Sequence, residues 1–200
     1  MKRNVSILLI VSCILIIFTL ILFAEEVKYD FRKTTWGMNE EQVKATEERE
    51  VGYEGNSVSG YALGYEVEID VNNYYCYYLF LENKLYQGRY MLNEKHVNKN
   101  LYIDDYEELK EVLTKKYGNP INKNEIYWED DLFKDNKVDW GLAISVGDLY
   151  YFSGWETPIT KISLELDGDN YKIRLILIYE SKELKEWADK ILEEKAKAEL

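Results

Sequence analysis

The amino-acid sequence predicts an α+β fold, in which an antiparallel β-sheet of meanders carries two or three helices packed on one face. Residues 5–24 carry no charge and form an N-terminal membrane or signal helix. Later segments alternate apolar and polar residues with a period of two, and single amphipathic helices separate these runs of strands. The chain has only 2 prolines. We therefore expect one domain over residues 25–180, followed by an amphipathic helix and a charged tail over residues 181–200.

The first 24 residues predict export. Lys2 and Arg3 precede the apolar run, and twenty helical residues span about 30 Å, the thickness of the hydrocarbon core of a bilayer. The positive-inside bias then places residues 25–200 outside the cytoplasm. Three outcomes stay open: a retained membrane anchor through residues 5–24, secretion after cleavage following Ala24, or lipidation at Cys13.

The folded part is expected to begin with a helix over residues 40–50. Asn39 and Gln42 match the capping-box pattern at its start, and Gly52 suits its C-terminal end. An antiparallel meander should follow, because one segment alternates strictly and the next is continuously apolar, as a central strand would be. Its three strands are expected over residues 61–71, 74–81 and 85–92.

The second helix has the clearest signals in the chain. Asp104 and Glu107 form an acidic capping box, and apolar residues then recur on one face as far as Tyr117. Gly118 suits the C-terminal end of the helix, and Pro120 prevents its continuation.

The second half is predicted to be mostly β. Ser181 should cap a final helix whose apolar stripe, from Leu184 to Leu192, would pack on the open face of the sheet. The two halves resemble a degenerate duplication of a helix-plus-meander unit, although the second would carry about two extra strands. Strands are expected over residues 126–128, 140–146 and 149–155, with a hairpin over residues 161–166 and 171–179.

Composition excludes several classes of function. Residues 25–200 hold 23 basic against 37 acidic residues, and such a surface disfavours nucleic acid and anionic phospholipid. Cys76 is the only cysteine after the leader, so no intramolecular disulfide forms there, and its apolar surroundings predict a core thiol. With His96 as the only histidine, neither a zinc site nor a catalytic triad is indicated. We expect no catalytic residue and no cofactor.

Tyrosine is the unusual feature of the composition, with 18 Tyr and 5 Trp. Aromatic side chains on one face of a strand stack on sugar rings or anchor a protein partner, and half-buried strand positions also favour tyrosine for packing alone. The candidates for ligand or partner binding are Tyr75 with Tyr77, and Tyr151 with Trp155. Weak candidates for calcium ligands are Asp130, Asp131 and Asp135, in a loop that solvation alone also explains.

Some of these residues resemble known families. The segment Trp36-Gly37-Met38-Asn39 resembles the opening of many small exported bacterial proteins without an assigned activity. In its order of elements the chain also resembles the domains of SmpA/OmlA small lipoproteins and of β-lactamase-inhibitor proteins, although it has one helix, not two, before each meander. Those proteins bind other proteins and do not catalyse, so the resemblance implies a binding role. It carries over no site residue.

The sequence therefore predicts an exported, non-catalytic binding protein of the bacterial cell envelope. An envelope protein or a cell-wall glycan would be its partner, because no glycine-rich phosphate loop or cofactor fingerprint is present. The alternative is a carboxylate-dependent hydrolase acting on an envelope polymer.

Overall fold

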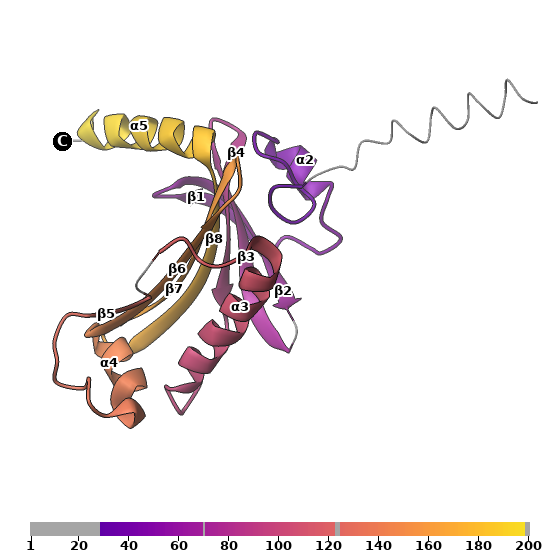
Figure 1. Ribbon diagram of the computed structural model, residues 1–200. Coiled ribbons are helices and arrows are strands. Elements are labelled where there is room, and N and C mark those ends of the chain that lie inside the picture. The colour runs from indigo at the N-terminus through magenta and orange to yellow at the C-terminus, as the bar shows by residue number, and fades with distance from the viewer. Residues whose placement is uncertain (1–28, 70, 123–124, 199–200) are drawn as a thin grey trace, which may run out of the picture.

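The computed structural model describes residues 29–69, 71–122 and 125–198, and it confirms the α+β class (Figure 1). The strands are β1 (Tyr53–Ser57), β2 (Gly60–Ile69), β3 (Asn72–Leu81), β4 (Lys84–Leu92), β5 (Ile126–Trp128), β6 (Leu149–Glu156), β7 (Thr160–Asp169) and β8 (Lys172–Ser181). All pair antiparallel in one sheet of order β1-β2-β3-β4-β8-β7-β6-β5. Each half of the chain is thus a four-stranded meander, and the two meanders join between β4 and β8.

Helices lie on both faces of this sheet, whereas the sequence predicted them on one. The helices are α2 (Glu40–Lys44), α3 (Leu101–Tyr117), α4 (Trp140–Val146), which follows a short 3-10 turn, and α5 (Lys182–Ala198). The first three pack with the larger core cluster on one side, which we call the covered face. Helix α5 packs on the other side of the sheet (Figure 1).

The covered face holds most of the core. Alternate residues of the strands point into it, among them Leu63, Tyr78, Leu164 and Trp155, and each is at most 2 % exposed. The α3 residue Tyr106 reaches this layer, where its hydroxyl lies 2.6 Å from the hydroxyl of Ser153. Several of the abundant tyrosines therefore fill the core with their hydroxyls partnered, as buried tyrosines usually are, whereas the buried hydroxyl of Tyr65 has no hydrogen-bond partner among the described residues.

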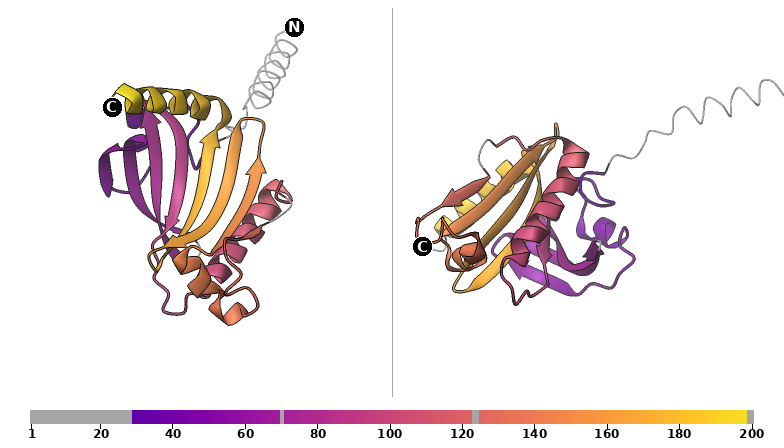
Figure 2. Two further views of the ribbon diagram at one scale, coloured as in Figure 1. Left: turned by 90° about the vertical axis from the view of Figure 1, so that its left-hand side faces the viewer. Right: turned by 60° about the horizontal axis from the view of Figure 1, so that its bottom comes forward.

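The opposite face, which we call the open face, is covered by α5 at one end only. Leu184, Trp187, Ile191 and their neighbours pack there on a small cluster that includes Leu79 and Tyr86. This confirms the expected position of the final helix, and Ser181 caps it by accepting a hydrogen bond from the Leu184 N–H. Along the rest of the strands, none of the helices in the described part of the chain crosses this face (Figure 2, left).

The first helix is shorter than predicted. The capping box between Asn39 and Gln42 is present, but α2 ends at Lys44 instead of continuing to residue 50. Only Val43 of the helix is buried, so packing gives little support to a longer one. The edge strand β1 over residues 53–57, beyond the predicted helix, was missed by the sequence analysis.

Helix α3 begins at Leu101, three residues before the predicted cap Asp104. The side chain of Asn100 does not cap it, because this amide is used elsewhere: its oxygen accepts the N–H of Gly141 at 2.6 Å. The predicted end is confirmed, since the N–H of Gly118 bonds to the carbonyl of Thr114 and its φ is +87°.

Residues 140–146 form helix α4 and not the predicted strand. The run alternates large apolar residues with small ones, and this pattern did not distinguish a buried strand from a short buried helix. Gly147, with φ +89°, ends the helix in the left-handed conformation, and Ala143 and Ile144 are fully buried against the sheet. This exchange leaves four strands in each half of the chain.

The leader predicted over residues 1–24 lies outside the described residues. Within the part of the chain that the structure describes, no helix is long and apolar enough to span a membrane.

Candidate functional site

The register of the sheet defines the open face residue by residue, because direct cross-strand partners point to the same side. Two rows of partners cross six strands. The first row is Glu66, Tyr75, Met91, Ile176, Glu165 and Phe152. The second is Gly64, Tyr77, Arg89, Ile178, Ser163 and Gly154. Apart from Glu66, which is exposed, and the two buried glycines, these residues are half-buried, so the rows form a largely apolar band.

One aromatic group lies at the β1 side of this band. The rings of Tyr75 and Tyr77 are 6.3 Å apart, and Tyr53 contacts Tyr77 edge-on with a centroid distance of 6.2 Å. Tyr53, Tyr77, Arg89 and Met91 also line a cavity of about 260 Å³. The structure therefore brings together the predicted pair Tyr75 and Tyr77 on an accessible surface, and it adds Tyr53 and Arg89, which the sequence analysis did not select.

Arg89 is the unusual polar group of this surface. One terminal nitrogen donates to the amide oxygen of Gln87 at 2.6 Å, and the Gln87 amide in turn donates to Glu180. The Nε of Arg89 is buried and has no hydrogen-bond partner among the described residues. Burial lowers the pKa of Arg89. Buried polar groups are normally satisfied, so this Nε, beside the half-buried rings of Tyr75 and Tyr77, is the unusual polar atom of the open face.

A second aromatic group lies at the β5 side of the open face. Tyr150 and Phe152 stack with their centroids 6.3 Å apart, and Tyr127 approaches Tyr150 at 5.8 Å. Burial raises the pKa of Tyr150. Aromatic groups thus flank a central strip of aliphatic side chains on both sides.

Glu165 lies between these groups in a cavity of about 310 Å³, which Phe152, Lys161 and Glu180 also line. Burial raises the pKa of its carboxyl group, and the negative charges of Asp167 and Glu180 add to the effect. Among the described residues, this carboxylate accepts a hydrogen bond from the Ser163 hydroxyl at 3.0 Å.

Glu165→Gln should therefore stabilise the protein near neutral pH. A carboxyl group whose pKa is higher in the folded than in the unfolded state lowers the free energy of unfolding once the pH exceeds its pKa in the unfolded state, about 4.3. We expect a gain on the order of 0.5 kcal/mol at pH 7, limited by solvent screening, and none at pH 3.5. Thermal unfolding at both pH values measures it. Glu66→Gln, an exposed carboxylate on the same face, is the control, and an equal gain at pH 3.5 would contradict the assignment.

The other predicted aromatic pair does not lie on this surface. Tyr151 and Trp155 are each 2 % exposed on the covered face. The Tyr151 ring contacts Tyr106 at 5.3 Å, and the indole N–H of Trp155 donates to the carbonyl of Gly118 at 2.8 Å. Both side chains pack in the core, which agrees with the alternative interpretation that strand positions favour aromatic residues for packing alone. Strand parity places Tyr151 and Trp155 on one face, but it does not tell which face the helices cover.

The candidate calcium loop does not gather its carboxylates. Asp130 accepts the N–H of Leu132, and Asp131 pairs with Lys134 at 2.8 Å. Across residues 29–69, 71–122 and 125–198, no three His, Cys, Asp or Glu side chains are placed to hold a metal ion, so Asp135 does not complete a site with the other two.

Cys76 is a buried free thiol, as predicted, and burial raises its pKa. A separate cavity of about 570 Å³ lies under the N-terminal segment and the end of α3. It is rich in aromatic side chains, but Asp30 is the one carboxylate in its lining, and this group accepts the N–H of Trp36. Glycosidase chemistry needs two facing carboxylates, which this cavity does not supply.

Comparison with known proteins adds no relative: no family model, no curated protein and no solved structure matches the chain.

Proposed function

We propose that this protein is an exported, non-catalytic binding protein of the bacterial cell envelope that holds a protein partner on the open face of its sheet. The observation that supports this most strongly is the apolar band beside Tyr75, Tyr77 and the under-satisfied Arg89. The apolar leader and the acidic composition support export to the envelope.

The composition of the open face favours a protein partner. Tyrosine, methionine and arginine are the residue types enriched at the centres of protein interfaces, and tyrosine and arginine carry much of the binding energy there. Here Tyr75, Tyr77, Met91 and Arg89 lie together, with Ile176 and Ile178 beyond them. A partner that lays apolar side chains over this band would remove it from water.

The charges of the open face define the chemistry of this partner further. Arg89 lacks an acceptor for its Nε, and Glu165 forms no ion pair within 4 Å among the described residues, although the charge of Arg174 acts on it from farther away. A segment that presents a carboxylate or a carbonyl group to Arg89 and a basic group to Glu165 would satisfy both. Opposite charges separated by an apolar strip also fix the orientation in which a partner binds.

Site-specific photocrosslinking in intact cells tests the proposal. A photoreactive residue in place of Glu66 or Lys161, at the rim of the open face, should capture the same partner. The matched control replaces Val112, which is 60 % exposed on α3 at the covered side. Equal capture from Val112, or none from either rim position, would contradict the proposal. A crosslinked product of twice the mass of the chain would instead indicate self-association.

The alternative function, a carboxylate-dependent hydrolase, has one observation in its favour. Glu165 and Glu156 line one cavity, and their pKa values are shifted in opposite directions, because burial raises that of Glu165 while the hydrogen bond from Lys182 lowers that of Glu156. Release of reducing ends from purified cell-wall glycan, lost in Glu165→Gln, would favour the enzyme over the binding protein.

A further inference from the structure

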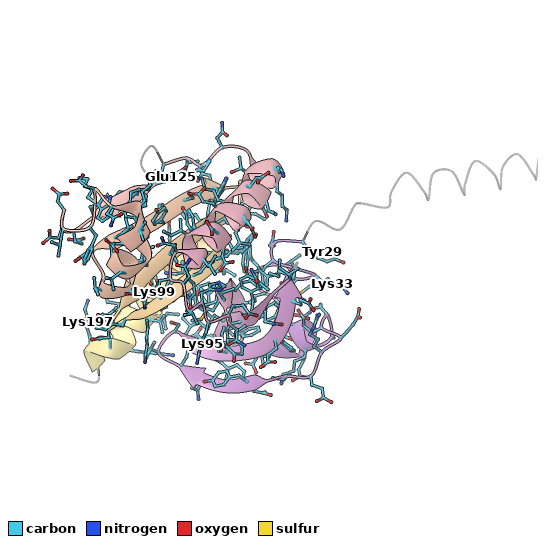
Figure 3. The ribbon with its side chains drawn as sticks, turned by 90° about the horizontal axis from the view of Figure 1, so that it is seen from below. Tyr29, Lys33, Lys95, Lys99, Glu125 and Lys197 are labelled. Atoms are coloured by element: carbon cyan, nitrogen blue, oxygen red, sulfur yellow. The ribbon has the colours of Figure 1, made fainter. Side chains whose placement is uncertain are left out.

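A second cleft of about 380 Å³ lies away from the open face, between the loop after β4, the start of α3 and the start of β8. Figure 3, which views the molecule from below, shows Lys95 and Lys99 on this lower side. The lining includes Lys95, His96, Lys99, Tyr102, Tyr171 and Lys172. Three lysines and a histidine from two segments, the loop after β4 and the start of β8, thus meet in a chain whose net charge is −12.

The three lysines of this cleft are not neutralised by the protein. None of them forms an ion pair with a carboxylate within the described residues, although eleven other basic side chains do. Lys99 donates only to the backbone carbonyl of Tyr171, at 2.8 Å. Glu94 is the one acid in the lining, and hydrogen bonds from Asn73 engage its carboxylate and lower its pKa. The cleft therefore keeps a net positive charge.

The wall of the cleft is held in place by a polar network. His96 Nε2 lies 2.6 Å from the Asp105 carboxylate, whose other oxygen accepts from the Asn72 amide at 3.2 Å. The Tyr102 ring packs edge-on against the imidazole, 4.7 Å away, and its hydroxyl donates to the carbonyl of Glu94. This hydrogen-bond network therefore fixes the segment that carries the basic groups.

Helix α3 adds a partial positive charge at the same place. It has 17 residues, and its N-cap residue Asn100 makes no side-chain capping bond, although the first N–H groups of the helix bond to the carbonyls of residues 98–100. Its N-terminal end lies directly after Lys99, so the helix dipole reinforces the lysines.

From this geometry we propose that the cleft binds a small phosphate-bearing ligand, such as a diphosphate or a phosphate ester. Lysine ammonium groups around a helix N-terminus suit phosphate oxygens. The volume exceeds that of one phosphate group, which leaves space for a second phosphate or an organic group beside Tyr102 and Tyr171. A compact soluble ligand is favoured over a bilayer of anionic lipids, because the acidic remainder of the surface repels an extended negative surface.

Calorimetric titration of the full chain in a neutral detergent tests the site, with pyrophosphate as the probe. We expect binding that weakens as salt is added, and a loss of about tenfold in affinity in Lys172→Met. Lys172 is exposed and makes no ion pair in the described structure, so this variant should fold normally. Lys99→Met should lose affinity to a similar degree. Lys190→Met removes the same charge from the exposed side of α5 and should bind as the parent does.

Three outcomes would overturn the proposal. They are the absence of pyrophosphate binding to the parent chain, an equal loss of affinity in Lys190→Met, and binding to phosphatidylglycerol vesicles that pyrophosphate does not displace. Retention of the parental unfolding midpoint by Lys172→Met separates loss of the site from loss of the fold. The site is independent of the open face, so either proposal can fail without the other.

Discussion

Glu47→Ala is expected to destabilise the protein by about 3 kcal/mol, which lowers the unfolding midpoint by roughly 10 °C. The Glu47 side chain is 5 % exposed, and its two oxygens accept from Arg32 at 2.7 and 3.1 Å. The hydroxyl of the buried Tyr78 donates to the same carboxylate. Without it, the half-buried Arg32 loses its counter-charge and the segment around Phe31 loses its attachment to the sheet.

Glu48→Ala is the control for this prediction. The neighbouring carboxylate pairs with Lys33 at 3.0 Å, but both side chains are largely exposed. Such a pair contributes less than about 1 kcal/mol. Thermal unfolding of both variants measures the difference, and an equal effect of the two substitutions would show that the Arg32–Glu47 pair does not anchor the N-terminal segment.

Gly141→Ala should destabilise the protein by about 3 kcal/mol. A Cβ atom at this position would lie 2.4 Å from the carbonyl carbon of Lys99 and 2.6 Å from the nitrogen of Asn100. Both are backbone atoms, so no side chain can move aside, and α4 must separate from the loop before α3. The variant should also lose pyrophosphate binding, because Lys99 belongs to the basic cleft.

Gly154→Ala supplies the comparison. A Cβ atom there would meet Phe152 at 3.5 Å and Ile121 at 3.7 Å, which are ordinary contacts. We expect a change within about 0.5 kcal/mol. If chemical denaturation gives Gly141→Ala the same small change, the close approach of α4 to residues 99–100 is incorrect.

The antiparallel meanders could be predicted from the sequence. Apolar and polar residues alternate with a period of two over residues 61–71 and 161–179, and turn-forming residues bound these segments. The exchange of a strand for a helix at residues 140–146 could not be predicted, because large apolar residues alternating with small ones fit a buried strand and a short buried helix alike. Residues 53–57 carry mostly small or polar side chains, so β1 depends on pairing with β2 and not on its own propensity. With these two corrections each half contains four strands, but the second half carries the additional helix α4 between β5 and β6.

The candidate site was predicted in part. Tyr75 and Tyr77 share an accessible face because residues two apart on a strand always do. Tyr151 and Trp155 also share a face, but which face α3 covers depends on tertiary packing. Arg89 was missed because its partners come from the register of β3, β4 and β8, which local sequence does not contain.

The central claim is that the open face binds the partner, and one affinity measurement tests it most directly. The partner captured at the rim positions is titrated against the parent chain and against the double variant Tyr75→Ala/Tyr77→Ala. Loss of two central aromatic anchors should weaken binding by about 100-fold. The unfolding midpoint of the double variant is measured alongside, because both half-buried rings also pack on the sheet. A change of less than about twofold in the dissociation constant would contradict the assignment of the open face as the binding surface.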